Sequence, residues 1–299
     1  MDAQDAIVAL QLVSTGVVLS YASLLDWRTR RVPNVFWIAM SAVAILLLVA
    51  RVILDEAPLE YLLILVPVLA VLADVYGQTD EPEGIRKFMP VVWYAVAIAA
   101  TVYLAHLWID DVDRYFAHLL TIPVMMILIV IMYMLDLVKG GADAKALLAL
   151  SIMFPFYPTI GALPIHAADT ATAEILFPFT FVVLVTAAII VAFTPLAFAA
   201  KNLAAGEFAF PYGLFGYKLD AEEARKGQVW LMERMEDGVH RTYTKPRGGE
   251  HLSEEIDKLV SAGHGRVWVT PKVPFIIPMT VAFVFTAIVG SILFVIMGL

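Results

Sequence analysis

The sequence has no cysteine and few charged residues. None of its 299 residues is cysteine and 16% are charged, against about 25% in an ordinary soluble domain. The missing thiols exclude disulfide bonds, cysteine catalysis and zinc sites built from cysteine. The formal net charge of −8 leaves no basic footprint of the kind that binds nucleic acid, so no nucleic-acid partner is expected.

Several familiar motifs are missing as well. The histidines have no His-Glu-x-x-His spacing, and no Gly-x-Ser-x-Gly turn surrounds a serine. We therefore expect no metal, no other cofactor and no serine-hydrolase chemistry. No small-residue cleavage site follows the first apolar stretch, so we interpret that stretch as a retained span and not as a signal peptide.

Apolar sequence is what the chain has in excess. Apolar residues make up 61% of it and the mean hydropathy is +0.82, which indicates a polytopic protein surrounded by membrane lipids. A helical span needs about 20 mostly apolar residues, and helices are expected because lipid offers no partner to exposed backbone groups. Eight stretches qualify: 7–25, 35–54, 59–75, 88–108, 115–138, 146–165, 176–200 and 274–298.

The charges between these stretches predict the orientation of the chain. With the N-terminus outside, the basic clusters at 28–31, 86–87 and 139–145 fall on the cytoplasmic side, whereas the outer loops are mostly acidic. This distribution follows the positive-inside rule. We therefore predict a multi-pass protein of the cell membrane.

Residues 201–272 form the one long polar segment, in which acidic and basic residues balance. Helix, hairpin and strand signals follow one another there: a helix at 220–227, a hairpin around Asp237-Gly238, a helix from Ser253 to Gly263 and a strand at 266–270.

The predicted fold is thus an all-α polytopic membrane protein of about eight transmembrane helices, with a small α+β cytoplasmic domain before the last helix. The predicted domains are a membrane domain at 1–200 that contains helices one to seven, a cytoplasmic domain at 201–272 and a C-terminal transmembrane helix at 273–299.

Two carboxylates stand where apolar stretches meet a basic rim. Asp26 lies in the stretch Leu-Asp-Trp-Arg-Thr-Arg-Arg-Val-Pro-Asn, and Asp143 lies in Lys-Gly-Gly-Ala-Asp-Ala-Lys. A carboxylate at such a depth costs about 2.5–3.5 kcal/mol at a helix centre and less near an end, so it is interpreted as functional. An even number of predicted spans separates the two, which places both at the cytoplasmic rim. Paired carboxylates that share one proton can hydrolyse a peptide bond.

Plainer interpretations of these residues stay open. An aspartate just after a span can be a solvated end charge, and Asp143 can be a simple N-cap for the helix that follows it. Asp136 lies two turns before Asp143, on the same face if the helix is unbroken, and from there it can tune the pair or bind Lys139. The small residues of Gly140-Gly141-Ala142 let another backbone approach closely.

The two stretches resemble the motifs of type IV prepilin peptidases. The first is similar to their Asp-x-Arg-x-x-x-hydrophobic-Pro-Asn signature, and the second to Gly-x-Gly-Asp in the Gly-Gly-Ala-Asp form of archaeal members; residues 266–275 resemble the archaeal C-terminal pattern. The resemblance implies that Asp26 and Asp143 are the catalytic aspartates. The residues that it implies as support for the motifs are Gly140, Gly141, Ala142, Lys145 and Asn34.

The resemblance also implies an activity. Such enzymes remove the short basic leader from prepilin-like and prearchaellin-like precursors at the cytoplasmic face, so precursor proteins are the expected partners. Two departures stand out. Ala142 replaces the second glycine, so the backbone should avoid positive φ there. Four predicted spans separate the aspartates where compact archaeal members have two, which indicates an inserted hairpin around the acidic loop at 80–83. Because cysteine is absent, we expect neither the zinc domain nor the methyltransferase activity of bacterial relatives.

Three alternatives remain. A structural scaffold for a filament machine would leave the aspartate pair unexplained. A protease similar to presenilin or signal peptide peptidase also uses Gly-x-Gly-Asp, but those families have Tyr-Asp inside a span and Pro-Ala-Leu near the end, whereas this chain has Leu-Asp at 25–26 and Val-Pro-Phe at 273–275. An ion-coupled transporter would bind cations through Asp74, Asp136 and Asp143. Such carriers often show matching broken helices in two repeats, and only one glycine-broken acidic site is present here.

Overall fold

The computed structural model describes residues 2–77, 88–109, 113–138, 140–167, 170–245, 252–272 and 274–298. The chain forms two compact units. The membrane unit comprises Met1–Ala188 and Pro274–Leu299, and the second unit comprises Ile189–Val273. The predicted acidic loop at 80–83 and Lys139 lie outside the described residues.

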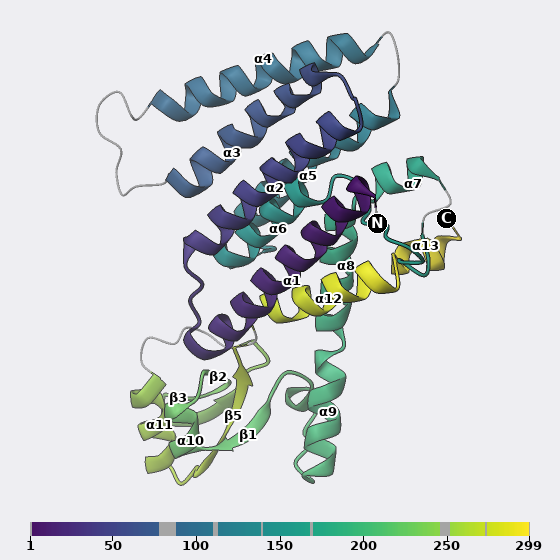
Figure 1. The fold of residues 1–299 in the computed structure, drawn as a ribbon. Helices are drawn as coiled ribbons and strands as arrows, with labels where there is room; N and C mark the ends of the chain where they lie inside the picture. Colours follow the sequence, from purple (N-terminus) through teal and green to yellow (C-terminus); the bar gives the residue numbers. More distant parts are fainter. Residues whose placement is uncertain are drawn as a thin grey trace. The chain divides into compact units, whose positions relative to one another are not determined.

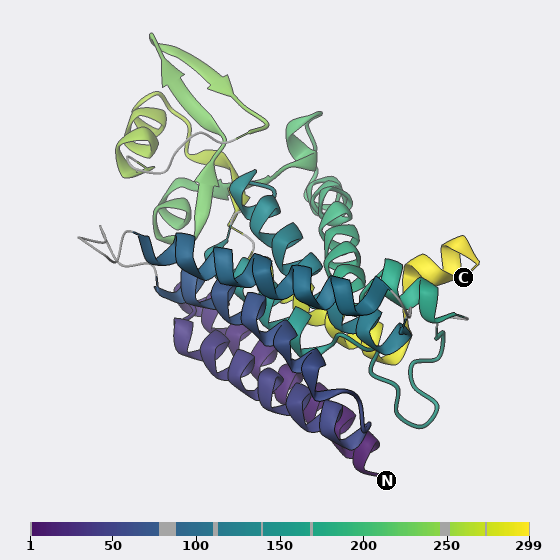
Figure 2. The ribbon, with the colours of Figure 1, turned by 90° about the horizontal axis from the view of Figure 1, so that it is seen from above.

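The membrane unit consists of helices (Figures 1 and 2). They are α1 (Ala3–Thr29), α2 (Asn34–Leu54), η1 (Leu59–Ile64), α3 (Leu65–Gly77), α4 (Met89–Ile109), α5 (Arg114–Met134), α6 (Gly141–Met153), α7 (Ala171–Leu176), α8 (Phe179–Ala192), α12 (Ile276–Ile288) and α13 (Ile292–Met297). Seen from above, α1 to α4 lie as a row of neighbouring helices, and α12 packs beside α1.

Among the described residues, five helices are long and apolar enough to cross a membrane. The predicted count of eight is therefore not confirmed. Val91–Leu104 and Ile276–Ile288 are apolar but shorter. The five candidate spans are Ala3–Thr29, Asn34–Leu54, Leu59–Gly77, Arg114–Met134 and Phe179–Ala204.

The predicted span at 146–165 is wrong beyond Met153, where α6 ends. Pro155 and Pro158 follow at once; each lacks a backbone N–H and disfavours helical geometry in the residue before it. The 13 residues of α6 measure about 20 Å at 1.5 Å per residue, less than the roughly 30 Å of a bilayer core.

The predicted last span at 274–298 is interrupted between α12 and α13. Gly290 has a φ of 104°, which residues with a side chain rarely adopt. Its backbone forms a parallel bridge with His166, and a Cβ atom at position 290 would overlap the His166 carbonyl group. The bend therefore requires glycine at this position.

α6 is buried in the membrane unit by α1, α2, α5 and α12. Its last residue, Met153, has a carbonyl group that no further turn of helix can satisfy, because the helix ends there. Gln11 of α1 fills this need: its side chain is buried, and Nε2 donates to the Met153 oxygen at 2.6 Å. A polar side chain of one helix thus allows a neighbouring helix to end inside the unit.

Replacing Gln11 by leucine is expected to lower the free energy of unfolding by about 1–3 kcal/mol, because the Met153 carbonyl would be left unpaired in apolar surroundings. Thermal unfolding of the purified protein in detergent measures this loss. Gln4→Leu is the control, since Gln4 bonds Asp55 at an exposed position. Equal effects of the two substitutions would contradict the special role of Gln11.

Polar contacts link the helix ends at the opposite end of α1 from Asp26. Asp55, at the end of α2, accepts hydrogen bonds from Gln4 of α1 at 2.7 Å and from Tyr115 of α5 at 3.0 Å, and it pairs with Arg51 at 3.4 Å. Gln4 precedes Asp26 by 22 residues of continuous helix, which corresponds to about 33 Å. These contacts are therefore remote from Asp26.

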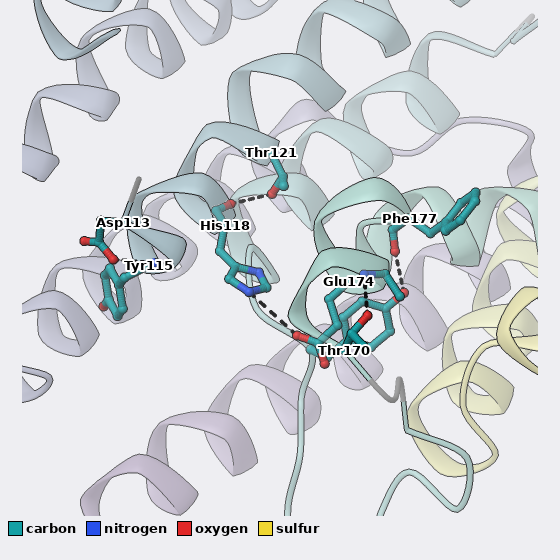
Figure 3. A network of polar contacts seen from close by, with 9 residues as sticks. Asp113, Tyr115, His118, Thr121, Thr170, Glu174 and Phe177 are labelled. Atoms are coloured by element: carbon teal, nitrogen blue, oxygen red, sulfur yellow. Dashed lines mark hydrogen bonds and ion pairs between the residues drawn. The ribbon is translucent and has the colours of Figure 1, made fainter. Parts of the chain in front are cut away.

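The same end contains a pair of titratable side chains, of which His118 is buried and Glu174 is partly buried. His118 of α5 points toward Glu174 of α7, with 3.8 Å between Nε2 and Oε2 (Figure 3). Burial raises the pKa of the Glu174 carboxyl, and the charge of Arg51 opposes this rise in part. We call Arg51, Asp55, Tyr115, His118 and Glu174 the far-end network.

The raised pKa of Glu174 predicts a pH-dependent stability. The folded state binds the proton more tightly than the unfolded state, so Glu174 contributes stability below its unfolded pKa, about 4.3, and loses it as the pH rises through the folded pKa. The melting temperature of the wild type should therefore fall relative to that of Glu174→Gln between about pH 4 and neutral pH. Against Glu60→Gln, at an exposed position, the melting temperature of the wild type should show no such change with pH. An identical change would contradict the assignment of the effect to Glu174.

The second unit is a small α+β fold. Its elements are α9 (Thr194–Ala204), η3 (Tyr212–Leu214), β1 (Tyr217–Asp220), α10 (Ala221–Lys226), β2 (Val229–Leu231), β3 (Glu233–Glu236), β4 (Val239–Thr242), α11 (Leu252–Ser261) and β5 (Arg266–Pro271). An antiparallel sheet has the order β1-β5-β2, and β3 pairs with β4. Ile256 and Leu259 of α11 pack with Val267 and Val269 of β5 in its core.

The predicted elements of this unit are confirmed, with one difference in pairing. The hairpin turns at Asp237-Gly238, where both residues have positive φ, as a tight two-residue turn requires. Its first predicted strand is divided at Met232. The N–H of Met232 donates to Trp268 in one sheet, while its carbonyl accepts from Tyr243 beside the other. β1 was not predicted from the sequence.

Candidate active site

The first aspartate lies in the last turn of α1. Arg30 ends the helix in a left-handed conformation, and its N–H donates to the Asp26 carbonyl at 3.0 Å. The guanidinium of Arg30 is near enough to attract the Asp26 carboxylate. Pro33 then precedes Asn34, the first residue of α2. The motif is therefore a helix end, a short connection and a new helix start.

The second aspartate lies in the first turn of α6, with Gly140 as the N-cap. The Asp143 side chain folds back over Gly140, so that a Cβ atom at position 140 would overlap its carboxylate. The φ of Gly140 is −88°, so glycine is needed here for space and not for conformation. Unpaired N–H groups and the helix dipole favour a negative charge at this end of a helix.

The other two small residues of the motif are under weaker constraint. Ala142 is helical and is not among the residues with positive φ, which confirms the expectation for this position. A Cβ atom on Gly141 would lie 3.7 Å from the Tyr133 hydroxyl oxygen, an ordinary van der Waals distance. Gly140 is thus the member of the motif that shapes the position of Asp143.

The structure places Asp26 and Asp143 near enough for the charge of Asp26 to act on the Asp143 carboxyl group. α1 packs against α6, and both aspartates are partly buried. A negative charge on one of two neighbouring acidic groups opposes the ionisation of the other. This arrangement is compatible with the predicted pairing of the two aspartates, which stays a prediction.

Two supporting residues of the motifs also meet. Lys145 Nζ of α6 donates to Asn34 Oδ1 of α2 at 2.9 Å. The same ammonium lies 5.9 Å from the ring centroid of Tyr76 in α3. Tyr76 was not singled out from the sequence. The available signal was the direction of the third span, which returns to the end of the unit where Asp26 lies.

Asp136 does not have the predicted geometry. The unbroken helix that would align it with Asp143 is wrong, because α5 ends at Met134 and α6 begins at Gly141. Asp136 is exposed in the intervening turn, with a φ of 57°. A dyad-tuning role therefore has no support from a shared helix face. Asp74 of α3 accepts a hydrogen bond from Tyr94 of α4 at 3.0 Å and so faces its own hairpin.

Comparisons with known proteins bear on this site. Residues 209–292 match the family described as Archaeal Peptidase A24 C-terminus Type II. A preflagellin peptidase of Methanocaldococcus jannaschii is 23% identical over 213 residues, which cover 69% of this chain and 86% of that relative. The resemblance to archaeal preflagellin peptidases is confirmed. Together with the apolar helices, it indicates a multi-pass membrane protein similar to these peptidases.

The overlap at Gly140 predicts a selective loss of peptidase activity. In Gly140→Ala the flexible Asp143 side chain is expected to move away while the fold persists, so cleavage should fall about 100-fold or more, the usual worth of a positioned acid or base. Gly141→Ala, which meets no close neighbour, should retain activity within about threefold and gain slightly in helix propensity. Cleavage rates of both variants, with their melting temperatures, test this. Equal activity of the two would contradict the geometry.

Proposed function

We propose that this chain is a membrane-embedded aspartic endopeptidase that removes the short basic leader from prepilin-like or prearchaellin-like precursors at the cytoplasmic membrane face. The observation that carries the proposal is the proximity of Asp26 and Asp143, whose carboxyl groups interact although they come from different helices. The similarity to an archaeal preflagellin peptidase supports the substrate class.

In the proposed mechanism a water molecule lies between the two carboxyl groups, one ionised and one protonated. The ionised carboxylate takes a proton from the water as its oxygen attacks the carbonyl carbon of the scissile peptide. The protonated carboxyl group donates to the carbonyl oxygen, which gives a neutral tetrahedral diol. A proton then passes to the peptide nitrogen, the C–N bond breaks, and a carboxylic acid and an amine leave.

The surroundings suggest which aspartate plays which part. Arg30 attracts the Asp26 carboxylate, which favours Asp26 as the ionised base. Burial of Asp143 and the negative charge of Asp26 outweigh the attraction of the helix N-terminus for a carboxylate, which favours Asp143 as the proton carrier. Because the pair shares one proton, the two parts exchange in the second half of the reaction.

The cytoplasmic location rests on charge. Arg28, Arg30 and Arg31 lie at the same helix end as Asp26, and positive residues are retained on the cytoplasmic side of membranes. In this orientation the N-terminus is outside, and the 201–272 domain is cytoplasmic.

The competing functions have less support. Asp26 lies in the last turn of its helix, whereas a presenilin-like protease would have this aspartate inside a span. A transporter would use Asp74, but this residue is bonded to Tyr94. The comparisons support a peptidase and point to neither alternative.

Asp26→Asn and Asp143→Asn should each abolish cleavage of a precursor with a basic leader, with a loss of about 100-fold or more, because asparagine can neither take nor carry the shared proton. Membranes that contain each variant are incubated with the precursor, and the shortened product is quantified on gels and by mass spectrometry. Asp136→Asn is the matched control and should cleave at the wild-type rate.

The outcomes separate the hypotheses. Cleavage that survives either substitution of the pair would refute the aspartic mechanism. A wild-type protein that cleaves no pilin-like or archaellin-like precursor would refute the substrate class. An equal loss in Asp136→Asn would show that the pair assignment is wrong.

A further inference from the structure

A side-chain contact near the aspartates joins the start of α6 to the start of α2. Lys145 lies two residues after Asp143 on α6, and its ammonium donates to Asn34 at the start of α2. Asn34 follows the turn that leaves Asp26. Lys145 therefore joins the helix that carries Asp143 to the helix that begins after the Asp26 turn.

The bond from Lys145 to Asn34 is poorly protected by itself. Asn34 is exposed, and an exposed polar contact to a long, flexible lysine side chain contributes little, since water competes for both groups and ordering the side chain opposes it. A second contact is needed to keep the ammonium in one place.

Tyr76 of α3 supplies such a contact. The Lys145 ammonium lies over the Tyr76 ring, 5.9 Å from its centroid, within the range of an attractive interaction between a cation and an aromatic face. The Tyr76 hydroxyl is buried beside Ser41 of α2. The hydroxyl end is thus packed between two helices, and this packing holds the ring while its face is presented to Lys145.

We propose that Tyr76 is a positioning residue of the active site. Its ring holds the Lys145 ammonium against Asn34, and this keeps the start of α6, with Asp143, in register with the end of α1, with Asp26. The inference rests on the proposed aspartic peptidase function. It also gives a role to α3, which forms a hairpin with α4 in the region where the sequence indicates an insertion between the aspartates.

The test measures kcat and KM for cleavage of a precursor peptide by variants that remove the Tyr76 ring, the Tyr76 hydroxyl or the Lys145 ammonium. Tyr76→Leu, which removes the ring, should lower kcat about tenfold at nearly unchanged KM, because the loss of a partly shielded cation–ring contact amounts to about that factor. Tyr76→Phe keeps the ring and should restore kcat to within about twofold. In a Lys145→Met background, Tyr76→Leu should cause no further loss, because the two residues act through one contact.

The controls distinguish positioning from general stability. Tyr94→Leu disturbs the same hairpin, through the bond from Tyr94 to Asp74, without reaching Lys145, and should leave kcat unchanged. If Tyr76→Leu melts too early for assay, Tyr76→Met fills similar space without a ring and replaces it. A kcat loss that persists in the Lys145→Met background, or that Tyr94→Leu reproduces, would overturn the inference.

Failure of this inference is distinct from failure of the proposed function. If the wild type cleaves, Asp26→Asn does not and Tyr76→Leu is fully active, only the role of Tyr76 is wrong. If Asp26→Asn cleaves like the wild type, the aspartic mechanism is wrong, and the positioning role falls with it.

Discussion

The hydrogen bond from Gln11 to the Met153 carbonyl lets α6 end inside the membrane unit. In an apolar interior an unpaired carbonyl group is unfavourable, so a helix can end there only where a side chain or another segment satisfies its last turn. With this end satisfied, a 13-residue helix is sufficient. Its N-terminus can then remain at the rim with Asp143, while the chain beyond Met153 leaves in turns and reaches the broken end of α12.

The two ends of the membrane unit are held in different ways. At the far end, charged and hydroxyl groups of several helices meet around Asp55, and α7 is attached through Glu174 and His118. At the end that carries the aspartates, Lys145 of α6 donates a hydrogen bond to Asn34 of α2. At both ends, polar contacts thus join helices that are distant in the sequence.

Local sequence was sufficient where local forces decide the structure. The Asp237-Gly238 turn, the ends of α10 and α11, and the long uninterrupted apolar helices followed from turn chemistry, capping and hydropathy. The meeting of Asp26 and Asp143 could be expected from their motifs and the even number of spans. Hydropathy did not predict where helices end inside apolar stretches. Examples are the end of α6 before Pro155, the break at Gly290 and the turn around Asp136. The contact of Tyr76 with Lys145 depends on packing between helices that are distant in sequence. No local sequence pattern therefore predicted it.

The place of Gly140 has a consequence for recognising similar sequences. A side chain at position 140 would displace the carboxylate, whereas positions 141 and 142 begin a regular helix and accept small side chains. A pattern that demands glycine directly before the aspartate rejects this chain, which has alanine there. A pattern that fixes glycine three places before the aspartate, followed by two helix-compatible residues, retains it. The first glycine of the motif is its most informative position. Searches that give this glycine the most weight should detect chains that the stricter pattern misses.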